Sequence, residues 1–168
     1  NIFKNSRIDI NQVDYVVIKE DENQNSVRYG DIFFTTSSET AEEVGMSSVL
    51  LEEVERLYLN SFCFGFRLNN FKVLLPQFAA YILRSSNIRK QISILGQGAT
   101  RYNLSKNQLM KLILKLPTIA EQKKIAEILT LSDQEIETLQ KKLNCLKRET
   151  KSLMQQLLTG KKRVKVAA

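Results

Sequence analysis

Two short polar stretches carry the residue types best suited to binding a ligand. The first is GQGATRYN at 96–103, in which two glycines precede Thr100 and Arg101. Glycines let backbone N–H groups approach a phosphate closely, and Arg101 can pair with a phosphate or with guanine O6 and N7. The glycine spacing matches neither a dinucleotide fingerprint nor a P-loop. A plain turn between two helices, with Arg101 solvated, explains the same residues, so both interpretations stay open.

The second stretch, TTSSET at 35–40, sets four hydroxyl side chains side by side where a strand is expected to end. Such hydroxyls can donate to phosphates or to base edges, although an ordinary polar loop has the same composition. A basic cluster of Arg84, Arg89 and Lys90 is a weaker candidate for contact with DNA. We expect it on an exposed helical surface, where charge usually serves solvation.

If the chain binds DNA, we expect the contacts to come from these two stretches and from the short helix that follows the second glycine. The candidate DNA-binding residues are Thr35, Thr36, Ser37, Gln97, Thr100, Arg101, Tyr102, Asn103 and Lys106.

The residues that most enzymes rely on are missing or already explained. The chain has no histidine, the commonest general base and a common metal ligand. Glu121-Gln122-Lys123 matches the residue types of a Mg²⁺-dependent nuclease motif. However, Glu121 stands at capping-box spacing from Thr118, which explains this glutamate as a helix-capping residue. The two cysteines form neither a disulfide framework nor a zinc site, and they favour a reducing compartment, the cytoplasm. We therefore expect no catalytic residue and no metal site.

The net charge of +7 and the pI near 9.4 favour an acidic partner, most commonly nucleic acid. This argument is weak alone because the tail KKRVK at 161–165 supplies four of the positive charges. No apolar run approaches the roughly 18–20 residues of a membrane span, and we identify no signal peptide.

The first 75 residues read as rich in β-structure. Runs of β-branched and aromatic residues predict strands within DYVVIKED, RYGDIFFTTSS, SVLLEEV and LYLNSFCFGFRLNN, at 14–21, 28–38, 48–54 and 57–70. In the last run Phe62, Phe64 and Phe66 alternate, which predicts three rings on one face of a strand.

Helices and one further strand are expected between residues 76 and 117. Pro76 suits the first position of a helix, and Ser86 is placed to cap a second helix that Gly96 ends. Ser105 begins a capping box before a short helix. LILKLP at 112–117 is predicted to be a strand.

A long helix follows Pro117. Thr118 and Glu121 form a capping box at its start, and Gly160 is placed to end it. A third box, from Ser132 to Glu135, predicts a kink or restart near 130–133. Beyond that point apolar residues recur in alternating steps of three and four, and the expected coiled-coil interface residues are Ile136, Leu139, Leu143, Leu146, Leu153 and Leu157.

An amphipathic helix that lies on its own domain would be the simplest source of this pattern. However, residues 134–158 would form a helix about 37 Å long, at about 1.5 Å per residue. The apolar stripe is also narrow, close to the two positions in seven of a coiled coil. We therefore favour a projecting helix that needs a second helix as its partner.

Four segments resemble one known family. The run LPTIAEQKKIAEILTLSDQEIETLQKKLNCLKRETKSLMQQLLTGKKRV at 116–164 resembles the conserved helical region of the DNA-specificity (S) subunit of type I restriction-modification enzymes. YGDIFFTT at 29–36 resembles a strand of that family's target recognition domain. LLPQFAAYILRSSNIRKQI at 74–92 resembles its helical pair, and GQGATRYNLSKNQLMKLILKLP at 96–117 its glycine loop, short helix and strand.

The resemblance implies a non-catalytic subunit that reads one half of a split DNA target. Its long helix would be a spacer arm, which pairs antiparallel with a second arm. Methyltransferase (M) subunits would dock on the assembly and use S-adenosylmethionine, and a restriction (R) subunit would use ATP and Mg²⁺, so no cofactor is expected in this chain. A full S subunit has two recognition domains and two helical regions. This chain has one of each, as a half-subunit or a fragment would.

These arguments together predict an α+β fold in which a target recognition domain with a twisted β-sheet precedes a long helix that forms an antiparallel coiled coil. The expected divisions are a recognition domain at 1–117, a helical arm at 118–160 and a basic tail at 161–168. We expect double-stranded DNA as a partner, and a homodimer through the arm. The alternatives are a coiled-coil scaffold without DNA specificity and an autonomous DNA-modifying enzyme.

Overall fold

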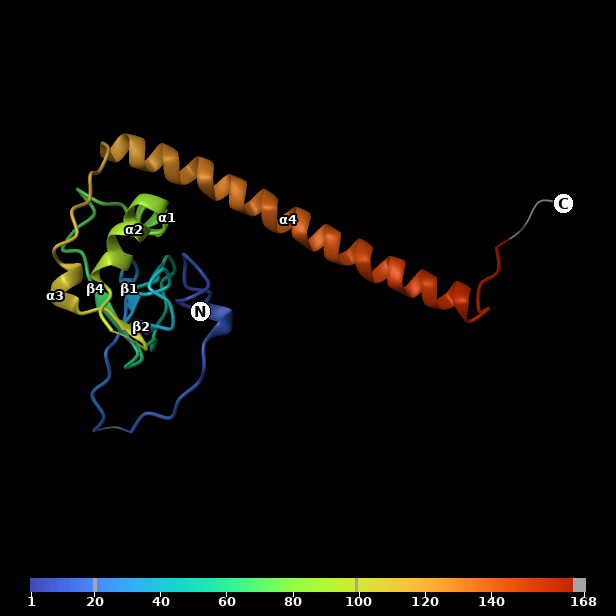
Figure 1. Cartoon of the computed structure of the whole chain (residues 1–168), viewed down its shortest axis with the longest axis horizontal. Coiled ribbons are helices and arrows are strands. Elements are labelled where there is room, and N and C mark those ends of the chain that lie inside the picture. Colours follow the sequence, from blue (N-terminus) through green and yellow to red (C-terminus); the bar gives the residue numbers. More distant parts are fainter. Residues whose placement is uncertain (20, 99, 165–168) are drawn as a thin grey trace. The chain divides into compact units, whose positions relative to one another are not determined.

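The computed structural model describes residues 1–19, 21–98 and 100–164, and residues 165–168 of the predicted basic tail lie outside this range. The chain forms two compact units, of which the first spans Asn1–Ala126 and the second begins at Glu127. The fold is α+β, with short strands and helices followed by one long helix (Figure 1). The elements are a 3-10 helix at Ile10–Gln12, strands β1 Ile32–Thr35, β2 Ser37–Ser38, β3 Ser47–Val49, β4 Cys63–Phe66 and β5 Tyr102–Asn103, and helices α1 Pro76–Ile82, α2 Ser86–Leu95, α3 Lys106–Leu109 and α4 Ile119–Leu158.

A small antiparallel sheet with the strand order β3-β1-β4 forms the centre of the first unit. Successive side chains of β1 point to opposite faces, so Ile32 and Phe34 pack in the cluster that α1 and α2 cover, while Phe33 packs in a second cluster. Both faces of β1 are therefore buried. This burial explains why its apolar residues are consecutive rather than alternating.

Two predicted strands are wrong. Residues 14–19 form no strand, and the side chains of Tyr15 and Val17 are almost fully exposed. Residues 112–117 also form no strand, although Leu112, Leu114 and Leu116 pack against the core while Ile113 stays exposed. The alternating burial of this segment thus arises from contact with the core, not from pairing with a sheet. High β-propensity shows that a segment suits a strand, but it does not supply a neighbouring strand to pair with.

Two smaller predictions also need correction. Phe64 and Phe66 pack against Phe34, with ring centroids 6.1 and 5.7 Å from it, but Phe62 precedes β4 and is exposed. The three rings therefore do not share one face. The N-cap position of α2 is Ser85 rather than Ser86, and its side chain makes no capping hydrogen bond.

The helix α4 is one unbroken element of 40 residues (Figure 1). Its predicted start is confirmed, because Thr118 N and Oγ1 donate to Glu121 Oε2 at 2.9 and 2.7 Å, and Glu121 N donates to Thr118 Oγ1 at 3.4 Å. The kink predicted near 130–133 is wrong. Ser132 does not cap a new helix, because its hydroxyl donates to the carbonyl of Ile128 one turn earlier, at 3.1 Å. Gly160 follows the helix end with φ at 72°, as predicted.

The first turns of α4 are anchored in the first unit by Gln122, whose side chain is fully buried. Gln122 Nε2 donates to the carbonyls of Val73 and Pro117 at 2.9 and 3.0 Å, and Gln122 Oε1 accepts from Leu75 N at 3.0 Å. Ala126, one turn later, is also buried. The amide therefore joins the start of α4 to the segment that leads into α1.

Candidate nucleic-acid interface

The two polar stretches singled out in the sequence meet in space. Strands β2 and β5 pair antiparallel, with Ser37 opposite Asn103 and Ser38 opposite Tyr102. The pairing extends by one further bond, from Leu104 N to the carbonyl of Thr36 at 2.8 Å. Side chains also join the two stretches, because Arg101 Nε donates to Ser37 Oγ at 3.2 Å. Residues 64 to 68 positions apart in the chain thus form one two-stranded surface.

A tight loop presents Arg101. Gln97 and Asn103 close it with two backbone hydrogen bonds, of 2.9 and 2.8 Å, and the side-chain amide of Asn103 donates to the Arg101 carbonyl at 3.2 Å. Gly98 has φ at 142°, and a Cβ atom there would lie 2.0 Å from the Arg101 carbonyl oxygen. Only glycine fits this position, so at least this glycine is required by the loop itself.

The hydroxyl groups of the first stretch are partly committed to the backbone. Thr35 Oγ1 accepts from Met46 N at 3.0 Å, and Thr36 Oγ1 donates to the Phe62 carbonyl at 2.9 Å. The Ser38 hydroxyl is buried and donates to the Thr40 carbonyl. The Ser37 hydroxyl differs from these three, because it accepts a hydrogen bond from the exposed side chain of Arg101.

The remaining candidates fall into different settings. Arg101, Gln97 and Thr100 are exposed on the loop, whereas Tyr102 is half-buried and packs against the main hydrophobic cluster. Lys106 lies in α3, where its Nζ is 5.4 Å from the centroid of the Phe66 ring. The structure thus brings Ser37, Gln97, Arg101, Tyr102 and Asn103 together, and places Lys106 in a neighbouring hollow.

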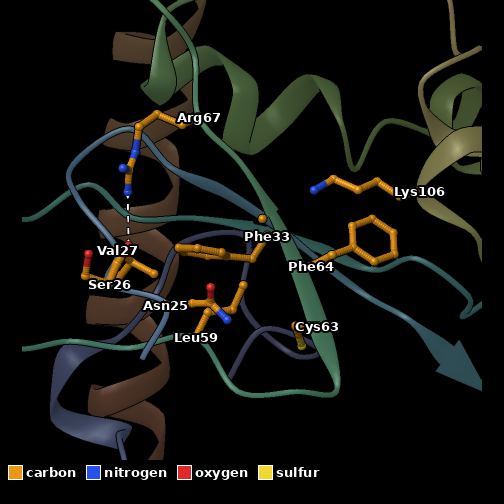
Figure 2. A pocket seen from close by; sticks show the side chains of 10 residues that line it. Asn25, Ser26, Val27, Phe33, Leu59, Cys63, Phe64, Arg67 and Lys106 are labelled. Carbon is orange, nitrogen blue, oxygen red and sulfur yellow. Dashed lines mark hydrogen bonds between the residues drawn. The ribbon is translucent and has the colours of Figure 1, made fainter. Parts of the chain in front are cut away.

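That hollow is an open pocket of about 310 Å³ beside β4 (Figure 2). Its lining combines aromatic and aliphatic side chains with Lys106, Arg67 and the thiol of Cys63. Arg67 is held in place, because its Nε and Nη2 donate to the two carboxylate oxygens of Asp31 at 2.8 and 2.6 Å, and its Nη2 also donates to the Ser26 carbonyl at 3.1 Å. Burial raises the pKa of the Cys63 thiol, so this sulfur is mainly protonated at neutral pH.

The basic cluster of Arg84, Arg89 and Lys90 has a structural role that the sequence prediction missed, and Arg84 lies in the turn between α1 and α2 rather than on a helix. The Arg84 guanidinium donates to the carbonyl of Ser47 and to four carbonyls within residues 2–5, at 2.7 to 3.2 Å. Arg89 donates to the carbonyls of Glu42, Val44 and Gly45 at 2.6 to 2.7 Å. Both guanidinium groups are partly buried and are committed to backbone carbonyls.

The electrostatic setting of Arg84 agrees with this role. Burial, and then the nearby charge of Arg89, lower the pKa of Arg84 to about 10. The group is still charged at neutral pH, and its charge strengthens its hydrogen bonds to the carbonyls. We therefore remove Arg84 and Arg89 from the candidates for DNA contact, and Lys90 alone of this cluster stays exposed.

The predicted coiled-coil residues form an exposed apolar row on α4. Leu157 is the least exposed at 39% and Ile136 the most exposed at 64%. Ile125 and Leu129 continue the row toward the start of the helix and are also exposed. Exposed leucines in a regular row on one helix are typical of an interaction surface. This row is the part of the chain best suited to a partner helix.

Sequence reasoning missed Gln122, although a usable signal was present. Ile119, Gln122 and Ala126 lie at i, i+3 and i+7, a second face of α4 beside the apolar row. A glutamine within such a buried face predicts a hydrogen-bonded amide.

Among the described residues, no group of His, Cys, Asp or Glu side chains is placed to hold a metal ion. No helix within the same residues combines the length and the apolar character needed to cross a membrane.

The first unit thus carries a paired polar surface on β2 and β5, and the helix α4 carries an exposed apolar row. A model of the family described as "Type I restriction modification DNA specificity domain" matches residues 3–148. The chain belongs to this family, as its sequence resemblance predicted.

Two curated relatives come from Methanocaldococcus jannaschii. The putative type I restriction enzyme MjaX specificity subunit is 30% identical over 159 residues, which are 92% of this chain and 36% of the relative. The type I restriction enzyme MjaVIII specificity subunit is 36% identical over 89 residues, which are 53% of this chain and 21% of the relative. The chain therefore spans about a third or less of the length of these two relatives.

Proposed function

We propose that this chain is the sequence-specific DNA-recognition part of a type I restriction-modification system, and that it reads one half of a bipartite target. The observation that carries the proposal is the pairing of the stretches 35–38 and 97–103 into one surface that presents Arg101. An arginine on a short, hydrogen-bonded loop can reach base edges in a major groove. The positive net charge supports attraction to the phosphate backbone.

In this proposal the chain binds and other subunits catalyse. Methyltransferase subunits dock on it and use S-adenosylmethionine, and a restriction subunit joins through them and uses ATP and Mg²⁺. The chain itself supplies no cofactor site and acts in the cytoplasm. Family membership supports this division of labour, because both relatives are specificity subunits by name.

The Arg101→Ala variant tests DNA recognition. If Arg101 contacts a guanine, its loss weakens binding to the mapped target by about 1–3 kcal/mol and relaxes specificity at one base. Electrophoretic shift with the target duplex and with random duplex measures both effects. Lys90→Ala removes an exposed cation from α2 and serves as the matched control. Unchanged affinity and unchanged specificity in Arg101→Ala would reject the role of Arg101.

We also propose that the apolar row on α4 pairs with the same row of a second copy. Full burial of a leucine side chain contributes about 1.5–3 kcal/mol, so a row of exposed leucines favours association. A two-fold antiparallel pair presents the same patch from each copy and gives two identical recognition domains. Leu143→Asp, in the middle of the row, is expected to convert dimer to monomer in sedimentation while the domain stays folded.

The exposed row also favours a second candidate function, a coiled-coil scaffold without DNA specificity. The two functions differ in their response to DNA. Phosphate-driven binding to random duplex is strong at low salt and weakens steeply as salt is added. Absence of any shifted band at low salt would favour the scaffold over DNA recognition.

A further inference from the structure

The apolar row on α4 has two polar interruptions, and their positions are symmetric. From residue 125 to residue 157 the row advances in steps of four and three that read the same from either end. Ser132 is third from the start of the row and Thr150 is third from its end. Lys141 lies nine residues from each of them, so it marks the centre of the pattern.

From this symmetry we infer the register of the dimer: two copies of α4 pair antiparallel, centred on Lys141, with Ser132 of each copy opposite Thr150 of the other. This inference rests on the self-pairing proposed above and adds its alignment. Each remaining row position then faces an apolar residue of the second copy. The facing pairs are Ile125 with Leu157, Leu129 with Leu153, Ile136 with Leu146, and Leu139 with Leu143.

The hydroxyl groups can enter such an interface without an unmet hydrogen bond. Ser132 Oγ donates to the Ile128 carbonyl at 3.1 Å, and Thr150 Oγ1 donates to the Leu146 carbonyl at 2.9 Å. Each donor is therefore satisfied within its own helix before any partner arrives. Since a buried polar group is costly mainly when it lacks a partner, a layer in which two such hydroxyls meet is acceptable inside the pair.

A shift of one heptad in either direction breaks this matching. Ser132 then faces Leu157 or Leu143 of the second copy, and Thr150 faces Leu139 or Ile125. The centred register has four facing apolar pairs, each formed twice by symmetry, whereas either shifted register has two such pairs, each formed twice. Twice as many apolar layers make the centred register the most favourable of the three.

Charged residues beside the row do not oppose this conclusion strongly. In the centred register Asp133 flanks Lys147 of the second copy with opposite charge, while Glu135 flanks Glu149 and Lys142 flanks Lys142 with like charge. These positions are exposed, so each interaction contributes little and salt screens it. The apolar layers therefore decide the alignment.

Disulfide trapping of the full chain tests the register. In a background of Cys63→Ser and Cys145→Ser, the pair Ile136→Cys with Leu146→Cys places thiols opposite each other in the centred register. Ile136→Cys with Leu153→Cys, and Leu129→Cys with Leu146→Cys, do so in the two shifted registers. Disulfides need Cα atoms about 4.4–6.8 Å apart, so we expect covalent dimers to form at least about tenfold faster with the first pair in a glutathione redox buffer.

The outcomes separate the register from the self-pairing on which it rests. Faster trapping of either shifted pair overturns the centred register and leaves self-pairing intact. Trapping of Ile136→Cys alone, through contact of residue 136 with itself, overturns the antiparallel direction. Sedimentation of the chain as a monomer at tens of micromolar, roughly the range expected for such an interface, overturns self-pairing and the register together.

Discussion

Replacement of Gln122 by methionine removes three hydrogen bonds while it keeps nearly the same side-chain length. Gln122 is fully buried, and its amide satisfies Leu75 N and the carbonyls of Val73 and Pro117. A neutral hydrogen bond contributes about 0.5–1.5 kcal/mol net, and a buried donor left without a partner costs about 1–3 kcal/mol. We therefore expect Gln122→Met to lower the free energy of unfolding of the first unit by about 3–5 kcal/mol.

Urea denaturation monitored by tyrosine fluorescence measures this change. All five tyrosines lie at or before Tyr102, within the first unit, so their signal reports the unfolding of that unit. With a slope of about 1–3 kcal/mol per molar urea, the unfolding midpoint falls by at least about 1 M. Since small domains are stable by only about 5–15 kcal/mol, the variant is left marginally stable.

Gln134→Met is the matched control, because Gln134 is an exposed glutamine in the same helix. We expect its midpoint to stay within error of the unmodified chain. If Gln122→Met unfolds at the same urea concentration as the control, the buried amide does not stabilise the start of α4 and the reasoning is wrong. Loss of far-ultraviolet helical signal at the same midpoint as the tyrosine signal would further show that the helix start and the domain unfold together.

Two further predictions concern ionisable groups. Hydrogen bonds from the side chain and then the backbone of Thr118 lower the pKa of Glu121 below its usual 4.5. The ionised Glu121 therefore stabilises the start of α4 above pH 4.5, and this stabilisation is lost as the pH falls through the lowered pKa. Amide protection in the first turn of α4 should decline over that range, and Glu121→Gln should remove the pH dependence. Cys145 is exposed while burial raises the pKa of Cys63, so iodoacetamide should modify Cys145 first at pH 7.5. Equal rates, or a Cys63–Cys145 disulfide under cytosol-like conditions, would contradict this prediction.

Local signals in the sequence predicted several features correctly. The box of Thr118 and Glu121, the proline at the start of α1 and the glycine after α4 each depend on a few adjacent residues. The heptad row also follows from one helix alone. Features of this kind need no knowledge of distant partners, which is why the helix positions and the α+β class could be predicted.

Features that depend on distant partners could not be predicted in the same way. Residues 14–19 have the composition of a strand but no neighbouring strand, and Arg84 satisfies carbonyls about 80 positions away in the chain. The error at Ser132 has a different cause, because a serine can cap a helix or donate to the preceding turn. Because α4 continues unbroken on both sides of Ser132, its hydroxyl donates to the preceding turn instead of capping a new helix.

The candidate site shows both situations. The sequence indicated the polar stretches at 35–40 and 96–103 separately, and only the pairing of β2 with β5 shows that they form one surface. The sequence also placed Arg84 and Arg89 among the possible DNA contacts, because a basic residue in or beside a helix has the same local pattern whether it faces solvent or a cluster of carbonyls. Burial and hydrogen bonding distinguish these roles, and both are set by tertiary structure.

Methylation mapping in cells that contain this chain and its partner methyltransferase tests the central claim most directly. The account predicts methylation at one bipartite motif whose two halves are identical and inverted, separated by a fixed number of unread bases. Arg101→Ala should then relax one base in both halves at once, since each copy carries the same loop. Methylation without any sequence motif would contradict DNA recognition by this chain, and a motif with two unlike halves would contradict recognition by two identical copies.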